Sequence, residues 1–266
     1  MLNNNLFVIP PLSVFDSQQE GCPPEQRSYG LYNYLRPGLI PHIKRQRFET
    51  ALKLARPYFG PNAAIDVGCG DGVFLPSLSR YFQNVAAIDR YDHVLHTAQQ
   101  LVEVAPLKNV TLLNNCDMDF EQVGEQLGRN FRVAFMLETL EHVGSLPNLY
   151  ESKADFLDGV FTLLQPEGVI IISVPRMVGL LFFIKYLMQW SLRLPTEPMQ
   201  WREVFRSAFL RDTRNLEPLW NGSHVGFNHL KLTEVLRSRF HLVECRGGLT
   251  SVFYVIARMP TSRTNK

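Results

Sequence analysis

The sequence predicts an α/β fold built around a mostly parallel β-sheet, and two observations support this prediction. Short apolar segments typical of buried strands alternate along the chain with segments whose apolar residues recur at helical spacing. The first apolar segment, residues 63–67, leads directly into a turn with glycine at every second position, Gly68, Gly70 and Gly72. A strand followed by a glycine-rich turn and a helix is typical of a nucleotide-binding sheet.

The composition is that of an ordinary globular protein. The 266 residues have a formal net charge of +2, with 45% hydrophobic and 20% charged residues. This length fits one α/β domain with an insertion, and the small charge gives no sign of a nucleic-acid partner. The cysteines lie far apart and form no C-x-x-C pair, so we expect neither a disulfide framework nor a zinc-cysteine site. A reducing, cytoplasmic location fits best.

Both ends of the chain are predicted to lie outside the main domain. Residues 1–38 read as a leader, and its first 15 residues lack the positively charged start of a secretory signal. Within it Tyr29, Tyr32 and Tyr34 are expected to cover the mouth of the site. Residues 260–266 are expected to form a disordered tail. A helix predicted over residues 40–58 leads into the first strand.

The glycine turn indicates which kind of ligand binds there. Glycine takes positive φ and has no Cβ, and a helix expected from Val73 would direct its N–H groups at the turn. The dinucleotide fingerprint requires a third glycine where this chain has Val73. Asp66, two residues before Gly68, would repel a pyrophosphate but suit a ligand with positive charge.

The second and third predicted strands also end in acidic turns. Residues 85–89 form a short strand ending in Asp89, about 20 residues past the turn, where an acid binds ribose hydroxyls in folds of this type. The alternative is a helix N-cap, a role for which Asp92 is better placed. A helix is predicted over residues 93–104, and the strand at 109–113 is followed by a turn that contains Asp117.

The fourth strand, residues 131–137, leads into Glu138, Glu141 and His142. At spacing i, i+3 and i+4, these side chains share one face if the segment is a helical turn. They could hold a divalent cation such as Mg²⁺, with His224 or His229 as a further ligand. Alternatively His142 is a general base, with Glu138 beside it in the catalytic set, or the group is purely structural.

The motif D-V-G-C-G-D-G resembles the first motif of class I, Rossmann-like S-adenosylmethionine-dependent methyltransferases. The E-x-x-E-H arrangement resembles that of ubiquinone-pathway O-methyltransferases and small-RNA 2'-O-methyltransferases, where it binds a metal. The resemblance implies a three-layer sandwich over residues 39–259, around a mostly parallel seven-stranded sheet with an antiparallel last strand. It also implies that the turn and Asp66 hold the amino-acid part of the cofactor, Asp89 the ribose and Asp117 the adenine. The implied cofactor-binding residues are Asp66, Gly68, Cys69, Gly70, Asp89, Arg90, Asp117, Met118 and Met136.

The second half of the chain supplies the remaining elements and an insertion. A helix is predicted over residues 156–164, a strand over 169–174, a helix over 231–240, and strands over 241–245 and 251–258. The minimal fold does not require residues 176–222.

Within this insertion the apolar run 178–190 is too short to span a bilayer. Its Lys185 and Trp190, with flanking Arg176 and Arg193, suit a helix lying in a membrane interface. A lid over the site and a homodimer contact are the alternatives. A helix-like run over residues 201–214 contains arginines, but acids lie between them and no stacking platform is recognisable, which disfavours RNA.

The predicted function is S-adenosylmethionine-dependent O-methylation of a small apolar or lipid-like acceptor. Two alternatives remain open: methylation of an RNA 2'-hydroxyl or another acceptor, and a non-catalytic nucleotide-binding module that contacts a membrane or a partner. The expected location is cytoplasmic. Peripheral attachment to a membrane through residues 178–190 is the alternative.

Overall fold

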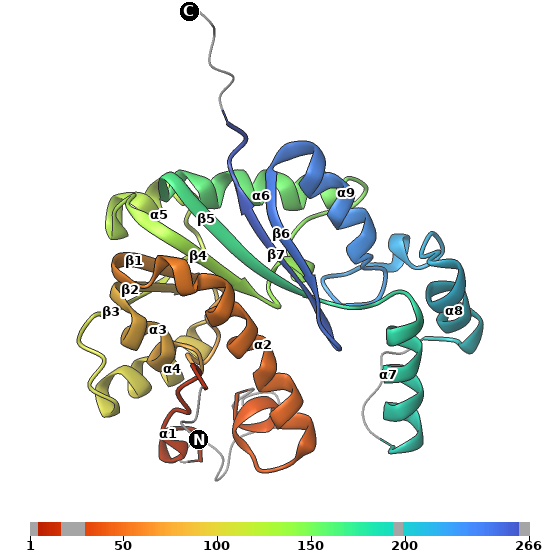
Figure 1. Cartoon of the computed structure of the whole chain (residues 1–266), viewed down its shortest axis with the longest axis horizontal. Helices are drawn as coiled ribbons and strands as arrows, with labels where there is room; N and C mark the ends of the chain where they lie inside the picture. Colours follow the sequence, from red (N-terminus) through yellow and green to blue (C-terminus); the bar gives the residue numbers. More distant parts are fainter. Residues whose placement is uncertain (1–4, 17–29, 194–198, 261–266) are drawn as a thin grey trace, which may run out of the picture. The chain divides into compact units, whose positions relative to one another are not determined.

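The computed structural model describes residues 5–16, 30–193 and 199–260 (Figure 1). Outside the described residues lie Tyr29, the segment 194–198 and all of the predicted disordered tail except residue 260. The chain divides into two compact units, Met1–Leu137 with Gly159–Ile171, and Glu138–Asp158 with Ile172–Lys266.

The strands form a seven-stranded sheet in the order β3-β2-β1-β4-β5-β7-β6. Their bounds are β1 Gly60–Val67, β2 Phe82–Asp89, β3 Val110–Asn114, β4 Phe131–Leu137, β5 Leu164–Pro175, β6 His241–Gly247 and β7 Ser251–Ala257. In β1, Ala64 lies opposite Val85 of β2 and Val133 of β4, and both pairings are parallel. β6 and β7 pair antiparallel. The predicted mostly parallel sheet with a reversed last hairpin is therefore confirmed.

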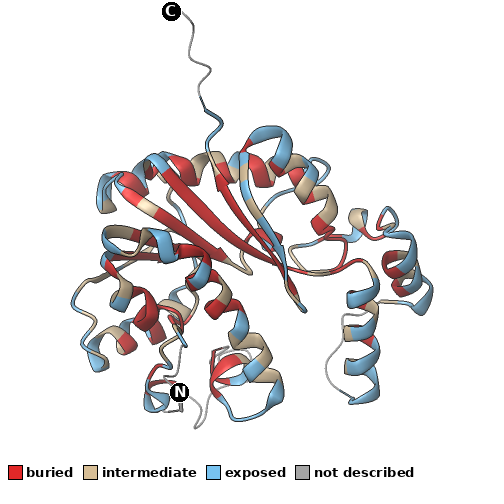
Figure 2. Ribbon diagram, in the orientation of Figure 1, coloured by how far each residue is buried: buried red, intermediate tan, exposed pale blue. Residues whose placement is uncertain are grey.

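Helices cover the strands of the first unit. They are α1 Leu12–Asp16, η2 Leu31–Leu35, α2 Leu39–Ala55, η3 Arg56–Tyr58, α3 Leu75–Tyr81, α4 Asp92–Val104 and α5 Phe120–Leu127. α3 packs on β2, and α4 packs on β2 and β3 (Figure 1). The core residues of β1, β2 and β4 are buried, as Figure 2 shows, which explains why these strands read as continuous apolar runs.

Several predicted boundaries in this unit shift by one to three residues, and the short helices of the leader and helix α5 were missed. The helix expected from Val73 begins at Leu75, and α2 ends at Ala55, where a short 3₁₀ turn containing Pro57 takes over. The first strand starts at Gly60 rather than at residue 63. Helix α5 was not predicted, although Asp119 and Gln122 form a capping box at its start, which is a signal readable from sequence.

The leader packs against α2 where it is described. The Glu49 carboxylate accepts hydrogen bonds from the backbone N–H groups of Leu6 and Phe7, at 3.1 and 2.8 Å. The Phe48 ring stacks between Phe7 and Phe74, with centroids 5.0 and 5.1 Å away. Residues 5–9 are thus bound to the helix that precedes the first strand.

The second unit contains the rest of the helices. They are η4 Leu140–His142, α6 Leu149–Thr162, whose last turn belongs to the first unit, α7 Leu180–Ser191, α8 Trp201–Phe205, η5 Arg206–Leu210, η6 Glu217–Leu219 and α9 His229–Arg239. α6 begins seven residues before the predicted start at residue 156, and β5 begins at Leu164 rather than 169. The run predicted to be helical to residue 214 ends at Leu210, because Arg211 takes a left-handed φ of 54°. Among the described helices, none combines the length and apolarity needed to cross a membrane.

Candidate functional site

The glycine turn follows β1 without a break, as the sequence predicts. Gly68, Gly70 and Gly72 have φ values of 80°, 56° and 81°, a region that L-residues with side chains rarely occupy. A Cβ on Gly72 would lie 3.0 Å from the Cβ of Ala98. The amide N–H groups of Gly68 and Cys69 both donate to the carbonyl of Ile88, at 2.8 and 3.1 Å. The turn is thereby closed against the end of β2.

Asp89, at the end of β2, holds the turn with its side chain. Its carboxylate accepts the N–H of Gly70 at 2.9 Å and the N–H of Tyr91 at 3.1 Å. The N-cap of α4 is Tyr91, which makes no side-chain cap bond, so neither acid is the N-cap. Asp92 instead lies in the first helical turn and accepts a hydrogen bond from the side chain of Asn114. Asp89 is therefore bound to the glycine turn, which supports its assignment to the ligand site.

Asp66 is buried behind the turn, with 3% of its surface exposed. Burial, and then the negative charge of Asp89, raise its pKa from 3.8 to about 7. A carboxyl group with this pKa is only partly ionised at neutral pH, so a cationic ligand would bind it and favour its ionised form. Burial also raises the pKa of the neighbouring Cys69 thiol well above its usual value, which keeps this cysteine neutral.

The remaining residues of the predicted cofactor set lie around the same strand ends. Asp117 is exposed in the turn after β3, and the Met118 N–H donates to the Asn115 carbonyl at 3.3 Å. Met136 is fully buried in β4. The Arg90 guanidinium carbon lies 5.6 Å from the centroid of the Tyr91 ring. Their contacts with a cofactor stay predictions.

Sequence reasoning missed a link between the glycine turn and the leader. The backbone N–H of Gly30 donates to the buried carboxylate of Asp71 at 2.6 Å. A Cβ on Gly30 would come within 2.2 Å of Val73, so the segment lies directly against the turn. Two residues of the predicted cover are described here: the Tyr34 hydroxyl accepts from Arg47 at 2.7 Å, and Tyr32 is exposed. The aspartate inside the glycine motif was the available signal for this link.

The E-x-x-E-H segment forms a 3₁₀ turn, and its two glutamates point to different places. Glu138 has a φ of 58°, and its carboxylate accepts from the hydroxyl groups of Ser173 and Ser251, at 3.2 and 2.9 Å. Among the described residues, the group that could hold a metal ion is Glu141, His142 and His224, and it does not include Glu138. The α-helical turn on which the shared face of Glu138, Glu141 and His142 depended does not form, because the backbone before the 3₁₀ turn is left-handed.

Glu141, His142 and His224, named here the EHH cluster, lie in the second unit. Glu141 is fully buried, and its Oε1 is 3.9 Å from Nε2 of His142 and 3.7 Å from Nε2 of His224. All three ligand atoms lie within 4.8 Å of one another. His229, the other predicted donor, is outside this cluster. It is buried at the start of α9, and burial lowers its pKa to about 4.

The hydrogen bond of His142 determines which of its nitrogens faces the cluster. Its Nδ1 lies within hydrogen-bond distance of the Gly222 carbonyl, which can only accept, so Nδ1 carries the proton. Nε2 then has the lone pair, and this nitrogen lies near Glu141. Burial lowers the pKa of His142, the main opposing effect being the bond to Gly222, so the neutral form is favoured at neutral pH.

Lys153 holds the backbone of the turn that bears the cluster, and sequence reasoning did not identify it. Its buried Nζ donates to the carbonyls of Leu140 at 2.9 Å, Glu141 at 3.0 Å and Val143. Trp220 donates from Nε1 to the same Glu141 carbonyl at 3.2 Å, and its ring lies 4.8 Å from the Lys153 ammonium. A lysine inside the apolar stripe of α6 was the available signal.

A cavity of about 380 Å³ lies at the other ends of the first strands. It is lined by Ala63, Asn84, Val85, Asn109 and Phe131, which begin or precede the body of β1 to β4. Ligands of open α/β sheets bind at the carboxyl ends of strands, where the glycine turn lies, so we do not assign the cofactor to this cavity.

Residues 42–213 match a family model described as a methyltransferase domain, which is more than half of the chain. This chain belongs to that methyltransferase family. The N-methyltransferase NodS of Bradyrhizobium japonicum, solved with S-adenosyl-l-homocysteine, covers 93% of this chain and 99% of its own at 12% identity, with a TM-score of 0.55. An S-adenosylmethionine-dependent methyltransferase of Clostridium acetobutylicum covers 80% and 91% at 11% identity, with a TM-score of 0.51. These structures share the fold.

Two sequence relatives come from eukaryotes. The mitochondrial ubiquinone biosynthesis O-methyltransferase of Schizosaccharomyces pombe is 28% identical over 129 residues, 48% of this chain and 43% of that protein. The enzyme of the same name from Arabidopsis thaliana is 26% identical over 161 residues, 59% and 46% of the two chains. This methyltransferase thus matches less than half of the length of either relative. The predicted class, a class I S-adenosylmethionine-dependent methyltransferase, is confirmed.

Proposed function

We propose that this methyltransferase transfers the methyl group of S-adenosylmethionine to a hydroxyl oxygen of a small apolar or lipid-like acceptor. The observation that best supports this choice is the EHH cluster, which provides a neutral imidazole next to a buried carboxylate. Such a pair suits removal of a proton from a hydroxyl. The similarity to proteins named as ubiquinone biosynthesis O-methyltransferases points to the same kind of acceptor.

The glycine turn, Asp66 and Asp89 would hold the cofactor. Asp66 would bind the ammonium of its amino-acid part, and Asp89 would accept hydrogen bonds from the ribose hydroxyls. The bound cofactor supplies a methyl group already activated by a sulfonium. The protein therefore mainly has to orient the acceptor and exclude water, and a dedicated base adds to this.

His142 would act as that base. Its Nε2 takes the proton of the acceptor hydroxyl as the oxygen–carbon bond forms and the sulfur–carbon bond breaks. Glu141 then stabilises the imidazolium, since its carboxylate lies 3.9 Å away. The bond from Nδ1 to Gly222 keeps the ring in the required orientation and tautomer.

A divalent cation is the second role that the EHH cluster supports. A buried carboxylate with two imidazole nitrogens inside 4.8 Å fits a cation, and Glu141, His142 and His224 would hold it. Two imidazoles and one carboxylate are more typical of Zn²⁺ than of Mg²⁺, which prefers oxygen ligands. A cation there would polarise and orient acceptor oxygens.

A methyl-transfer assay tests the proposed reaction. The protein is incubated with S-adenosylmethionine labelled in the methyl group and with catechols bearing apolar side chains, matching amines, or RNA. We expect label in the catechols, and loss of most activity in His142→Ala but not in the surface control His93→Ala. Transfer to amines or RNA instead of catechols would overturn the acceptor class, and absence of cofactor binding by calorimetry would overturn the enzyme assignment.

Metal binding by the EHH cluster can be measured independently of methyl transfer. We expect purified protein to bind Zn²⁺ in equilibrium dialysis, and His224→Ala to bind it roughly 10–100-fold more weakly. His229→Ala, outside the cluster, is the matched control. Full activity after exhaustive chelation would assign His142 the base role and reject the cation.

A further inference from the structure

Exposed apolar side chains are concentrated in one part of the second unit. Of the 22 large hydrophobic residues exposed in the described part of the chain, 12 lie between Leu180 and Leu219. Scattered exposed apolar residues are normal in a globular protein, but a contiguous group marks a contact surface. Figure 2 shows α7 as largely exposed.

One side of helix α7 packs against the second unit, and the other side is exposed. Phe182 and Tyr186 are buried, and the Phe183 ring lies 5.1 Å from that of Phe209. The exposed side, named here the α7 surface, consists of Leu180, Leu181, Ile184, Leu187, Met188 and Trp190. The first five recur at i, i+1, i+4, i+7 and i+8, the pattern of one helix face. The α7 surface is therefore exposed to solvent although its residues are of the apolar types that usually form a protein core.

The two helical turns that follow extend this surface with aromatic residues. Trp201, Phe205 and Phe209 are exposed at spacing i, i+4 and i+8 along α8 and η5. The Trp201 ring packs edge-on against Trp190, with centroids 5.6 Å apart. Two exposed tryptophans thus meet at the end of α7. Tryptophan prefers the boundary between lipid headgroups and hydrocarbon.

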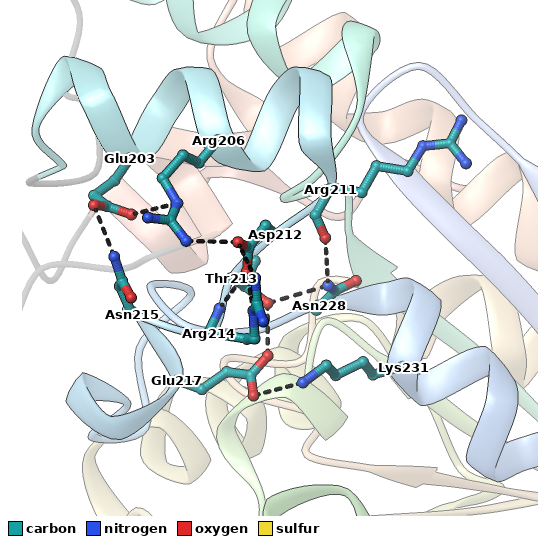
Figure 3. Close-up of polar contacts among 10 residues, drawn as sticks. All are labelled: Glu203, Arg206, Arg211, Asp212, Thr213, Arg214, Asn215, Glu217, Asn228 and Lys231. Carbon is teal, nitrogen blue, oxygen red and sulfur yellow. Dashed lines mark hydrogen bonds and ion pairs between the residues drawn. The ribbon is translucent and has the colours of Figure 1, made fainter.

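The charges around the α7 surface favour an anionic partner. Residues 180–200 contain two cations, Lys185 and Arg193, and one acid, Glu197. The described acids of the following segment are engaged inside the unit (Figure 3). Asp212 binds Arg206 at 2.6 Å and Arg214 at 3.0 Å, and Glu217 binds Lys231 at 2.7 Å.

The same polar network holds the segment in place. The Asn228 side chain donates to the Arg211 carbonyl at 3.4 Å and to the Thr213 hydroxyl at 3.1 Å (Figure 3). Asn228 also caps α9, by accepting the N–H of Leu230. The segment that follows α8 is therefore held in place by hydrogen bonds to the residue that caps α9.

We propose that the α7 surface docks on an anionic lipid bilayer, with α7 lying in the interface. Its 12 residues are too few to span a membrane but suit a helix in the headgroup region. The exposed Arg193 would extend toward lipid phosphates while the apolar face enters the hydrocarbon boundary. A symmetric dimer through this face is less favourable, because it would place the same cations of two copies near one another.

Vesicle flotation tests the proposal without requiring catalytic activity. The full chain is mixed with vesicles of phosphatidylcholine alone or of equimolar phosphatidylcholine and phosphatidylglycerol. We expect flotation with the anionic vesicles, less with neutral ones, and a decrease at high salt. The double variant Ile184→Asp/Leu187→Asp should bind roughly tenfold more weakly or worse. Val104→Asp, at an equally exposed apolar position in α4, should float as wild type does.

Fluorescence and sedimentation complete the test. Trp190 and Trp201 are 57% and 42% exposed, whereas Trp220 is 8% exposed, so vesicles should blue-shift the emission of wild type but not of Trp190→Phe/Trp201→Phe. Unchanged thermal melting and cofactor binding of Ile184→Asp/Leu187→Asp would show that this variant is folded. Absence of flotation with either vesicle would overturn the proposal, as would a lipid-free dimer that the double variant dissociates. Neither result would affect the proposed methyl transfer.

Discussion

Replacing Asp66 by asparagine should stabilise the ligand-free protein near neutral pH and weaken cofactor binding at the same time. The carboxyl group is buried, and its pKa is raised from 3.8 to about 7 by burial and by Asp89. Between these values the folded protein retains a proton that the unfolded chain has lost. The stability of wild type therefore falls as pH rises from about 4 to about 7.

The size of the effect follows from the pKa shift. One pKa unit corresponds to about 1.4 kcal/mol, so Asp66 costs the folded protein about 2 kcal/mol at pH 5 and about 4 kcal/mol at pH 8. Asparagine has nearly the same shape and no charge, so it removes this cost. At roughly 2 °C per kcal/mol for a chain of this size, the melting temperature should rise by several degrees at pH 8 and by less at pH 5.

Thermal melts across this pH range and calorimetry with S-adenosylmethionine provide the assay. We expect Asp66→Asn to bind the cofactor roughly 10–100-fold more weakly, because it lacks the charge that binds the ammonium. Asp92→Asn makes the same carboxylate-to-amide change at an exposed position on α4 and is the matched control for cofactor binding, which it should leave unchanged. The reasoning is refuted if Asp66→Asn keeps the pH–stability profile of wild type, or if it binds the cofactor equally well.

Three further predictions concern single positions. Lys153→Met should lower the free energy of unfolding by about 3 kcal/mol in urea titrations, because three backbone carbonyls lose a hydrogen bond from the buried ammonium, whereas exposed Lys53→Met should change it by less than about 0.5 kcal/mol; equal effects would contradict the positioning role. Gly72→Ala should cost about 1–3 kcal/mol through its positive φ and the close Ala98 contact, and an unchanged melting temperature would contradict this. Asp89→Asn should weaken cofactor binding at least about tenfold while the protein stays folded by circular dichroism, and wild-type affinity would remove Asp89 from the ribose site.

The sequence by itself determined the parallel sheet and the position of the cofactor turn. Residues 63–67 form a buried strand in any arrangement that covers both faces, and Gly68, Gly70 and Gly72 allow the turn that follows. The sequence also shows an acidic residue at or after the end of each of the first strands. Because parallel strands bring their carboxyl ends to one edge of the sheet, these acids were expected to lie near the same ligand site. These signals are local, and neighbouring residues suffice to interpret them.

Only the tertiary structure decided which side chains meet and which remain exposed. The spacing of Glu138 with Glu141 predicted one shared face, but the left-handed φ of Glu138 sends its carboxylate to Ser173 and Ser251, and His224 joins the cluster from a distant segment. The apolar residues of α7 had the same composition whether they formed a lid, a dimer contact or a membrane face. Such outcomes depend on contacts between residues far apart in the chain, and a local pattern contains no information about those contacts.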